Sequence, residues 1–211
     1  MSAPRRALQA KGAALSEPED DEDVGRSAER WTNGRRVGRL APMSTTDTQK
    51  ASPAAIALQP GEGDARWFLG ALLTIKSSRE TTDGRAAVIE HHASQGHGSP
   101  LHVHHNEDEW FYVTEGELTF WTGGQVIKGP AGSFVYLPRD VPHTFLVSSS
   151  EARFLLVVEP AGFEGFVREL SEPAGERTLP PATVQPPSPE QMTATAAKYG
   201  LDILGPPGIP T

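Results

Sequence analysis

The chain has 211 residues, a hydrophobic content of 37% and a formal net charge of −8. This length suffices for one domain with a full core and is marginal for two, and the acidic balance argues against nonspecific binding to nucleic acid. The sequence has no cysteine, which excludes disulfides and thiolate metal ligands. No stretch is long and apolar enough to span a bilayer, so we expect no membrane partner and a cytoplasmic protein.

Residues 1–43 are predicted to be a disordered leader. They combine Ala, Arg and Gly with the acidic run Glu17–Asp23 and have almost no apolar periodicity. Composition favours a solvated leader without a role over an interaction tail. Met43 and the residues after it look like an ordinary protein start, so we expect residues 1–42 to lie upstream of the true start. N-terminal peptide mass spectrometry of native protein would test this.

A polar lead-in at 44–65 precedes a region, 66–160, in which short β-forming segments alternate with turn signals. Gly123-Gly124 is typical of a hairpin turn, and Phe154–Val158 is continuously apolar, as in a strand covered on both faces. This spacing predicts an all-β sandwich or barrel. Besides the strand that carries the histidine pair described below, the expected strands lie near residues 66–69, 72–76, 85–92, 110–114, 117–122, 125–127, 134–137, 143–147 and 154–158.

Residues 161–211 are predicted to form a helical, Pro-rich extension. The segment 162–170 can form a short helix with four apolar side chains on one face. After a Pro-rich, extended stretch at 173–189, a second helix should begin at Pro189 and end at Gly200. We expect both helices to cover the outer face of the barrel or to contact a partner subunit.

Two histidines and a carboxylate stand out within the β-rich region. His102 and His104 are two residues apart and would share one face of a strand, and a turn over 106–108 would return Glu109 to the same point. His143 follows a Pro-bounded turn downstream. Imidazole nitrogens and one carboxylate oxygen suit a divalent transition metal. A lone histidine would favour an ordinary polar residue, whereas four such side chains in this arrangement predict a metal site.

These residues resemble the two sequence motifs of the cupins. The first motif reads G-x5-H-x-H-x4-E-x6-G and is matched position for position by Gly96, His102, His104, Glu109 and Gly116. The second reads G-x5-P-x-G-x2-H-x3-N and is matched at Gly132, Pro138 and His143. Asp140 and Val147 replace the second glycine and the asparagine. Neither replacement touches a predicted ligand, and aspartate tolerates positive φ better than most residues.

The cupin resemblance implies a double-stranded β-helix, the jelly-roll barrel, over residues 66–160, with one copy of each motif and hence a single barrel. Together with the uncovered sheet edges of such a barrel, it implies a homodimer. It also implies one bound divalent transition metal: Fe, Mn, Ni, Co, Cu or Zn. Four protein ligands would leave one or two coordination positions open, unlike a closed structural zinc site.

The run His104–Val113 is closest in wording to the small quercetin-dioxygenase-like cupins. That resemblance implies a dioxygenase that uses O2 on a flavonol or another enolic small molecule. Glu109 would then hold the metal and accept the proton of the substrate hydroxyl. Two alternatives stay open: a non-redox isomerase or lyase, and a non-catalytic module that binds a small molecule or a metal.

The substrate pocket is predicted to be apolar. Alternation along the strands puts Phe111 and Val113 on the face of Glu109, and Phe145 on the face of His143; Val135 and Leu137 should line the same interior. Such walls suit an apolar or aromatic small molecule, although each residue taken alone fits simple core packing. Other polar residues nearby are expected at the surface or in solvated turns: His97, His105, Glu107, Asp108 and Arg139.

Overall fold

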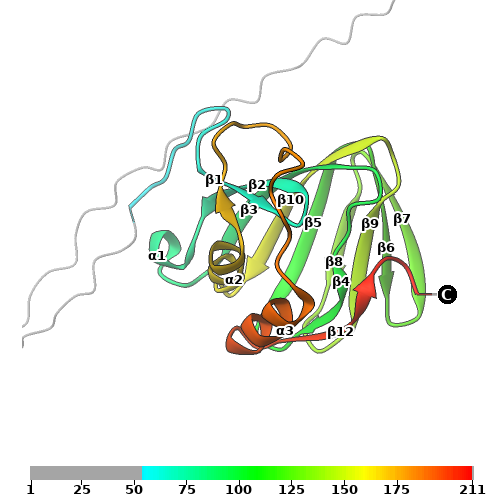
Figure 1. Ribbon diagram of the computed structural model, residues 1–211. Coiled ribbons are helices and arrows are strands. Elements are labelled where there is room, and N and C mark those ends of the chain that lie inside the picture. Colours follow the sequence, from blue (N-terminus) through cyan, green and yellow to red (C-terminus); the bar gives the residue numbers. More distant parts are fainter. Residues whose placement is uncertain (1–53, 211) are drawn as a thin grey trace, which may run out of the picture. The chain divides into compact units, whose positions relative to one another are not determined.

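The computed structural model describes residues 54–210, so the predicted leader at 1–43 lies outside the described residues. Two antiparallel sheets dominate this part of the chain (Figure 1). The seven-stranded sheet has the order β11-β1-β2-β3-β10-β5-β8 and the five-stranded sheet the order β12-β4-β9-β6-β7. The predicted all-β barrel with short C-terminal helices is confirmed. No helix in the described residues is long and apolar enough to cross a membrane.

The bounds of the elements follow the predicted turns closely. The strands are β1 Asp64–Phe68, β2 Ala71–Ser77, β3 Ala87–Ser94, β4 Pro100–His104, β5 Asp108–Glu115, β6 Glu117–Thr122, β7 Gln125–Pro130, β8 Phe134–Leu137, β9 His143–Val147, β10 Glu151–Glu159, β11 Glu172–Pro173 and β12 Leu201–Pro207. The helices are α1 Arg79–Thr82, α2 Phe163–Leu170 and α3 Pro189–Lys198.

Alternation of side chains builds the barrel interior. On β3 and β10 every second residue is buried, and these strands pair with each other in the seven-stranded sheet. Phe154 and Leu156 point into the core, while Leu155 and Val157 on the opposite face are half-buried. The outer face of β10 is therefore less covered than its continuous apolar run indicated, because neither described sheet packs on it.

The two predicted C-terminal helices form, but they do not simply cover the outer face. Helix α2 buries Phe166 and Val167 in the main core, and its first residue, Phe163, reaches the ring of His104 with centroids 5.2 Å apart. The buried carboxylate of Glu164 accepts hydrogen bonds from the backbone N–H groups of Arg79 and Gly162. This helix is thus fixed beside the predicted metal site.

Two strands in the C-terminal extension were not predicted. The longer, β12, pairs with β4, the strand that carries His102 and His104. Its Gly205, Pro206 and Pro207 argue against a strand in the sequence, because proline removes a ladder donor. The structure accommodates them at a sheet edge with register shifts between Ile203 and Gly205 and between Gly205 and Pro207. The end of the chain thereby covers an edge that would otherwise be open.

Candidate metal centre

All four predicted ligands meet between the two sheets. His102 and His104 lie on β4, His143 lies on β9, and Glu109 lies on β5 in the other sheet. Pairing of β4 with β9 sets His102 opposite His143, and the turn after β4 brings Glu109 back. One ligand atom from each of the four side chains lies within 4.8 Å of the others, and all four side chains are buried.

Backbone carbonyl groups orient two of the imidazoles. Nδ1 of His102 lies 2.8 Å from the carbonyl oxygen of Pro100, and Nδ1 of His143 lies 2.8 Å from that of Val141. A carbonyl can only accept, so in the neutral imidazole each Nδ1 carries the proton and each Nε2 keeps its lone pair for the centre. This is the tautomer that a metal ligand bonded through Nε2 requires.

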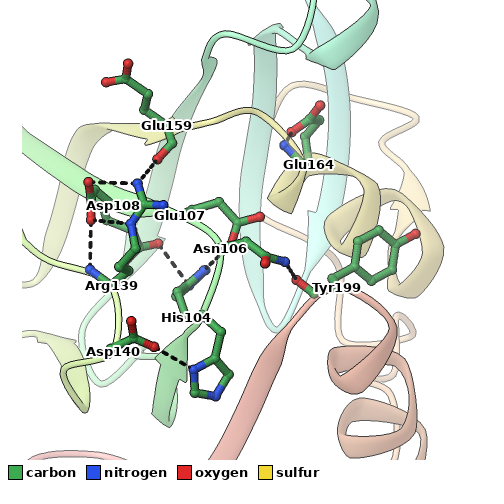
Figure 2. A network of polar contacts seen from close by, with 12 residues as sticks. His104, Asn106, Glu107, Asp108, Arg139, Asp140, Glu159, Glu164 and Tyr199 are labelled. Carbon is green, nitrogen blue, oxygen red and sulfur yellow. Dashed lines mark hydrogen bonds and ion pairs between the residues drawn. The ribbon is translucent and has the colours of Figure 1, made fainter.

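The third imidazole is oriented by a carboxylate. Nδ1 of His104 lies 3.1 Å from Oε2 of Glu107 (Figure 2). Glu107 was expected to be a solvated turn acid; that expectation is wrong, because the residue is only 3% exposed. Gly162 leaves it room, since a Cβ atom there would lie 3.0 Å from Glu107 Oε1. The position of Glu107 in a polar turn gave no signal of this role, which depends on α2 closing over the turn.

The centre has the charge and the unpaired atoms that a cation would satisfy. Nε2 of His104 lies 3.3 Å from Oε1 of Glu109, and Nε2 of His143 lies 3.0 Å from its Oε2. Within residues 54–210 neither Nε2 finds a hydrogen-bond partner of normal geometry. Lone pairs facing a buried carboxylate repel it unless a proton or a metal ion lies between them. The donor set therefore fits a divalent transition metal.

Burial and neighbouring charge set the protonation of the ligands. Burial, reinforced by His143 and His104, lowers the pKa of His102 to about 3. Burial opposes ionisation of Glu109, but the nearby imidazoles of His104 and His143 outweigh burial and lower the pKa of this carboxyl to about 2. For His143, burial lowers the pKa, but the carboxylate of Glu109 close to Nε2 outweighs burial, so the pKa of His143 is raised. A metal would therefore compete with a proton held between His143 and Glu109.

A cavity of about 50 Å³ adjoins the centre, with His102 and Glu109 in its wall. Of the predicted pocket residues, Phe111 and Phe145 line it. The other three, Val113, Val135 and Leu137, are buried in the core and are not among its lining residues. Nine further lining residues were not predicted as ligands or substrate contacts, among them Phe68, Leu69, His91, His97 and Phe163.

Surface ion pairs hold the loops around the centre. Arg139 binds Asp108 through two nitrogens, at 3.1 and 3.0 Å (Figure 2). The exposed ring of His105 bonds Asp140 and Asp202, which joins the end of β4 to β12. Asp140 has a φ of 61°, so it adopts the left-handed backbone for which the second motif has glycine. These contacts fix the strand ends from which Glu109 and His143 project.

The fold and the donor set define a β-barrel with a candidate mononuclear metal centre in its interior. Residues 89–158 match the cupin domain family. The chain is also 33% identical over 116 residues to the quercetin 2,3-dioxygenase of Bacillus subtilis. Residues 89–158, which contain all four residues of the candidate centre, are thus a cupin domain.

The match to the Bacillus subtilis dioxygenase covers 55% of this chain and 34% of the relative, so the chain spans about a third of that protein's length. Among solved structures, a predicted oxalate decarboxylase from Thermotoga maritima has a TM-score of 0.46 and 19% identity, covering 50% of this chain and 99% of its own. An oxalate decarboxylase variant from Bacillus subtilis has a TM-score of 0.45 and 20% identity, covering 50% of this chain and 29% of its own. At these scores neither structure bears on function.

Proposed function

We propose that the chain is a metal-dependent dioxygenase that acts on a small enolic substrate. The observation that carries the proposal is a buried cluster of three histidines and one glutamate that opens onto a cavity walled by Phe111, Phe145 and Phe163. The resemblance to a quercetin 2,3-dioxygenase over more than half of the chain supports the same reaction class.

The four residues of the centre would have two different roles in this reaction. His102, His104 and His143 would hold the ion through Nε2, and Glu109 would supply the negative ligand oxygen. A bound divalent ion would supply Lewis-acid chemistry, and a redox-active one electron transfer as well. With a pKa of about 2, Glu109 is a weak base. It can accept the substrate hydroxyl proton only when that hydroxyl has become unusually acidic. The aromatic wall keeps water from the reacting atoms.

The size of the cavity favours a small substrate. Its volume of about 50 Å³ is roughly a third of the ~150 Å³ that an engineered protein cavity uses to hold benzene. A flavonol has three rings and would need the wall to move. We therefore rank small acyclic enols above flavonols for this chain.

Metal analysis followed by oxygen-electrode assays tests the proposal. We expect about one metal ion per chain and O2 uptake with at least one redox-active metal when acyclic enols are supplied. The variant His104→Ala is the control and should lose both. No uptake with any metal or enol would defeat the dioxygenase assignment and leave the metal site intact. Turnover without O2 would instead favour an isomerase or lyase.

A homodimer and a cytoplasmic location remain part of this proposal. Phe134 and Tyr136 on the edge strand β8 are 63% and 46% exposed, which supports a covered edge in solution. Light scattering after size-exclusion chromatography would measure the mass; a monomer across the accessible concentration range would contradict the dimer.

A further inference from the structure

His91 is a buried polar side chain in a position that the barrel pattern reserves for apolar ones. On β3 the inward residues are Ala87, Ile89, His91 and Ala93. The ring of His91 is 5% exposed and stacks on Phe154 with centroids 4.5 Å apart. Within residues 54–210 neither of its nitrogens has a hydrogen-bond partner. A phenylalanine would fill this place without leaving two polar atoms unpaired.

The unpaired nitrogens carry a cost that packing does not offset. A buried donor or acceptor left without a partner is destabilising, and such groups in native proteins usually serve a ligand or a bound water. Burial lowers the pKa of His91 to about 3, so at neutral pH the imidazole is uncharged and offers one N–H donor and one lone pair.

The other polar side chains in the cavity wall already have partners or another role. Nδ1 of His97 donates to the carbonyl oxygen of Leu69 at 3.1 Å. The hydroxyl of Ser99 lies 3.3 Å from that of Thr144. The remaining two, His102 and Glu109, belong to the metal centre. Among the cavity-lining side chains in residues 54–210, His91 is thus the one outside the metal centre with neither ring nitrogen in a hydrogen bond.

We propose that His91 is a substrate-binding residue, whose imidazole holds a second oxygen of a small compound while the first oxygen lies at the metal centre. This inference depends on the proposed function only for the assumption that another oxygen of the substrate lies at the metal centre, at the other end of the cavity. Because the imidazole is neutral, it suits an uncharged carbonyl or hydroxyl rather than a second carboxylate. The substrate class that follows is a short, enolisable molecule with an oxygen function at each end of the cavity.

Two ligands that differ by one carbonyl oxygen test the assignment. Acetoacetate and butanoate share a four-carbon acid skeleton, and acetoacetate carries one additional ketone oxygen. With the zinc-loaded full chain, we expect calorimetry to give a dissociation constant for acetoacetate roughly tenfold lower than for butanoate, as expected for one neutral hydrogen bond. In zinc-loaded chain labelled with ¹⁵N-histidine, acetoacetate should shift the His91 imidazole resonances.

His91→Phe keeps the stacked ring and removes both nitrogens, so the two acids should then bind within about twofold of each other, with zinc content unchanged. His92→Phe makes the same change at the neighbouring outward position and should keep the tenfold preference. His91→Gln, which retains a donor and an acceptor, should recover part of it and serves as the second variant if His91→Phe does not fold.

A preference that persists in His91→Phe, or that is absent from the wild-type chain, would overturn the assignment. So would His91 resonances that do not respond to acetoacetate, which would indicate that the imidazole binds only a buried water. The dioxygenase proposal fails separately: absence of O2 uptake with the acetoacetate preference intact would leave His91 as a ligand-binding residue.

Discussion

Two layers of the barrel use the same strands for different purposes. The inward positions of β5 run from Glu109 through Phe111 to Val113, and those of β9 from His143 to Val147. The first residue of each series belongs to the metal centre, and the last is buried in the apolar core, where Val147 lies opposite Leu118. Strand alternation alone therefore does not separate a site from a core.

What distinguishes the layers is their surroundings. The apolar layer needs only close packing, and Leu118, Val113 and Val147 have it. The metal layer needs a hydrogen-bond partner behind each imidazole, and the chain supplies two backbone carbonyls and Glu107. Changes in the first layer should alter stability and spare metal binding, and changes in the second should do the reverse.

The largest expected effect is on stability. Leu118→Ala removes a fully buried side chain from the apolar layer and should lower the free energy of unfolding by about 2–5 kcal/mol, because it leaves a cavity. Urea unfolding would measure this, and the folded protein should still bind one metal ion. Val126→Ala, at an exposed position on β7, should change stability by less than about 0.5 kcal/mol. Loss of metal from folded Leu118→Ala would show that the layers are not independent.

The second largest expected effect is the loss of metal affinity when a predicted ligand is removed. His104→Ala should weaken metal binding by more than about 100-fold, since loss of a ligand should exceed the effect of losing an outer partner. Competition with a chelator would measure the affinity. The exposed neighbour His105→Ala is the matched control and should bind metal as the wild type does. Unchanged metal affinity in His104→Ala would mean that the ligand set is wrong.

Substitution of Glu107 tests how much the orientation of the His104 imidazole contributes to metal affinity. Glu107→Ala leaves the His104 Nδ1–H without its acceptor and should weaken metal binding by about 10–100-fold, with Glu107→Gln at the mild end. Circular dichroism should find both variants folded. Glu115→Gln, which changes an exposed carboxylate at the opposite end of β5 from Glu109, should have no effect on metal binding. Equal metal affinities for Glu107→Ala, Glu107→Gln and Glu115→Gln would mean that Glu107 only packs against its neighbours and does not orient His104.

The smallest effect is a pH dependence. The raised pKa of His143 means that metal must displace its proton, so affinity should rise with pH until that pKa is passed, by up to about tenfold per unit. With pKa values of about 3 and about 2, His102 and Glu109 do not titrate near neutrality.

The stability of the metal-free protein should change with pH in the opposite direction and fall as pH rises. The contact between protonated His143 and Glu109 is fully present below the unfolded pKa of His143 and is lost as pH rises through its raised folded value. Chelator competition and urea unfolding, each measured between about pH 5 and 9, give the two trends. Affinity that stays flat across this range would contradict a proton shared by His143 and Glu109.

Sequence patterns predicted most of the barrel because its strands are short, several of them alternate regularly, and many end next to a glycine or a proline. They missed β12, since Gly205 and two prolines look like a loop until the free edge of β4 gives them a partner. They also placed Val113, Val135 and Leu137 beside the substrate, because period two specifies the inward face and not the depth along the barrel.

The sequence by itself determined the types and spacing of the four candidate ligands, because the strand of His102 and His104 and the turn before Glu109 have clear local patterns, and His143 follows a Pro-bounded turn. Only the tertiary structure decided which side chains support them. Glu107 meets His104 because α2 closes over the turn, and His91 meets the cavity because β3 lies in the sheet opposite the histidine strands. Such contacts join segments far apart in the chain, and no local pattern encodes the distance between them.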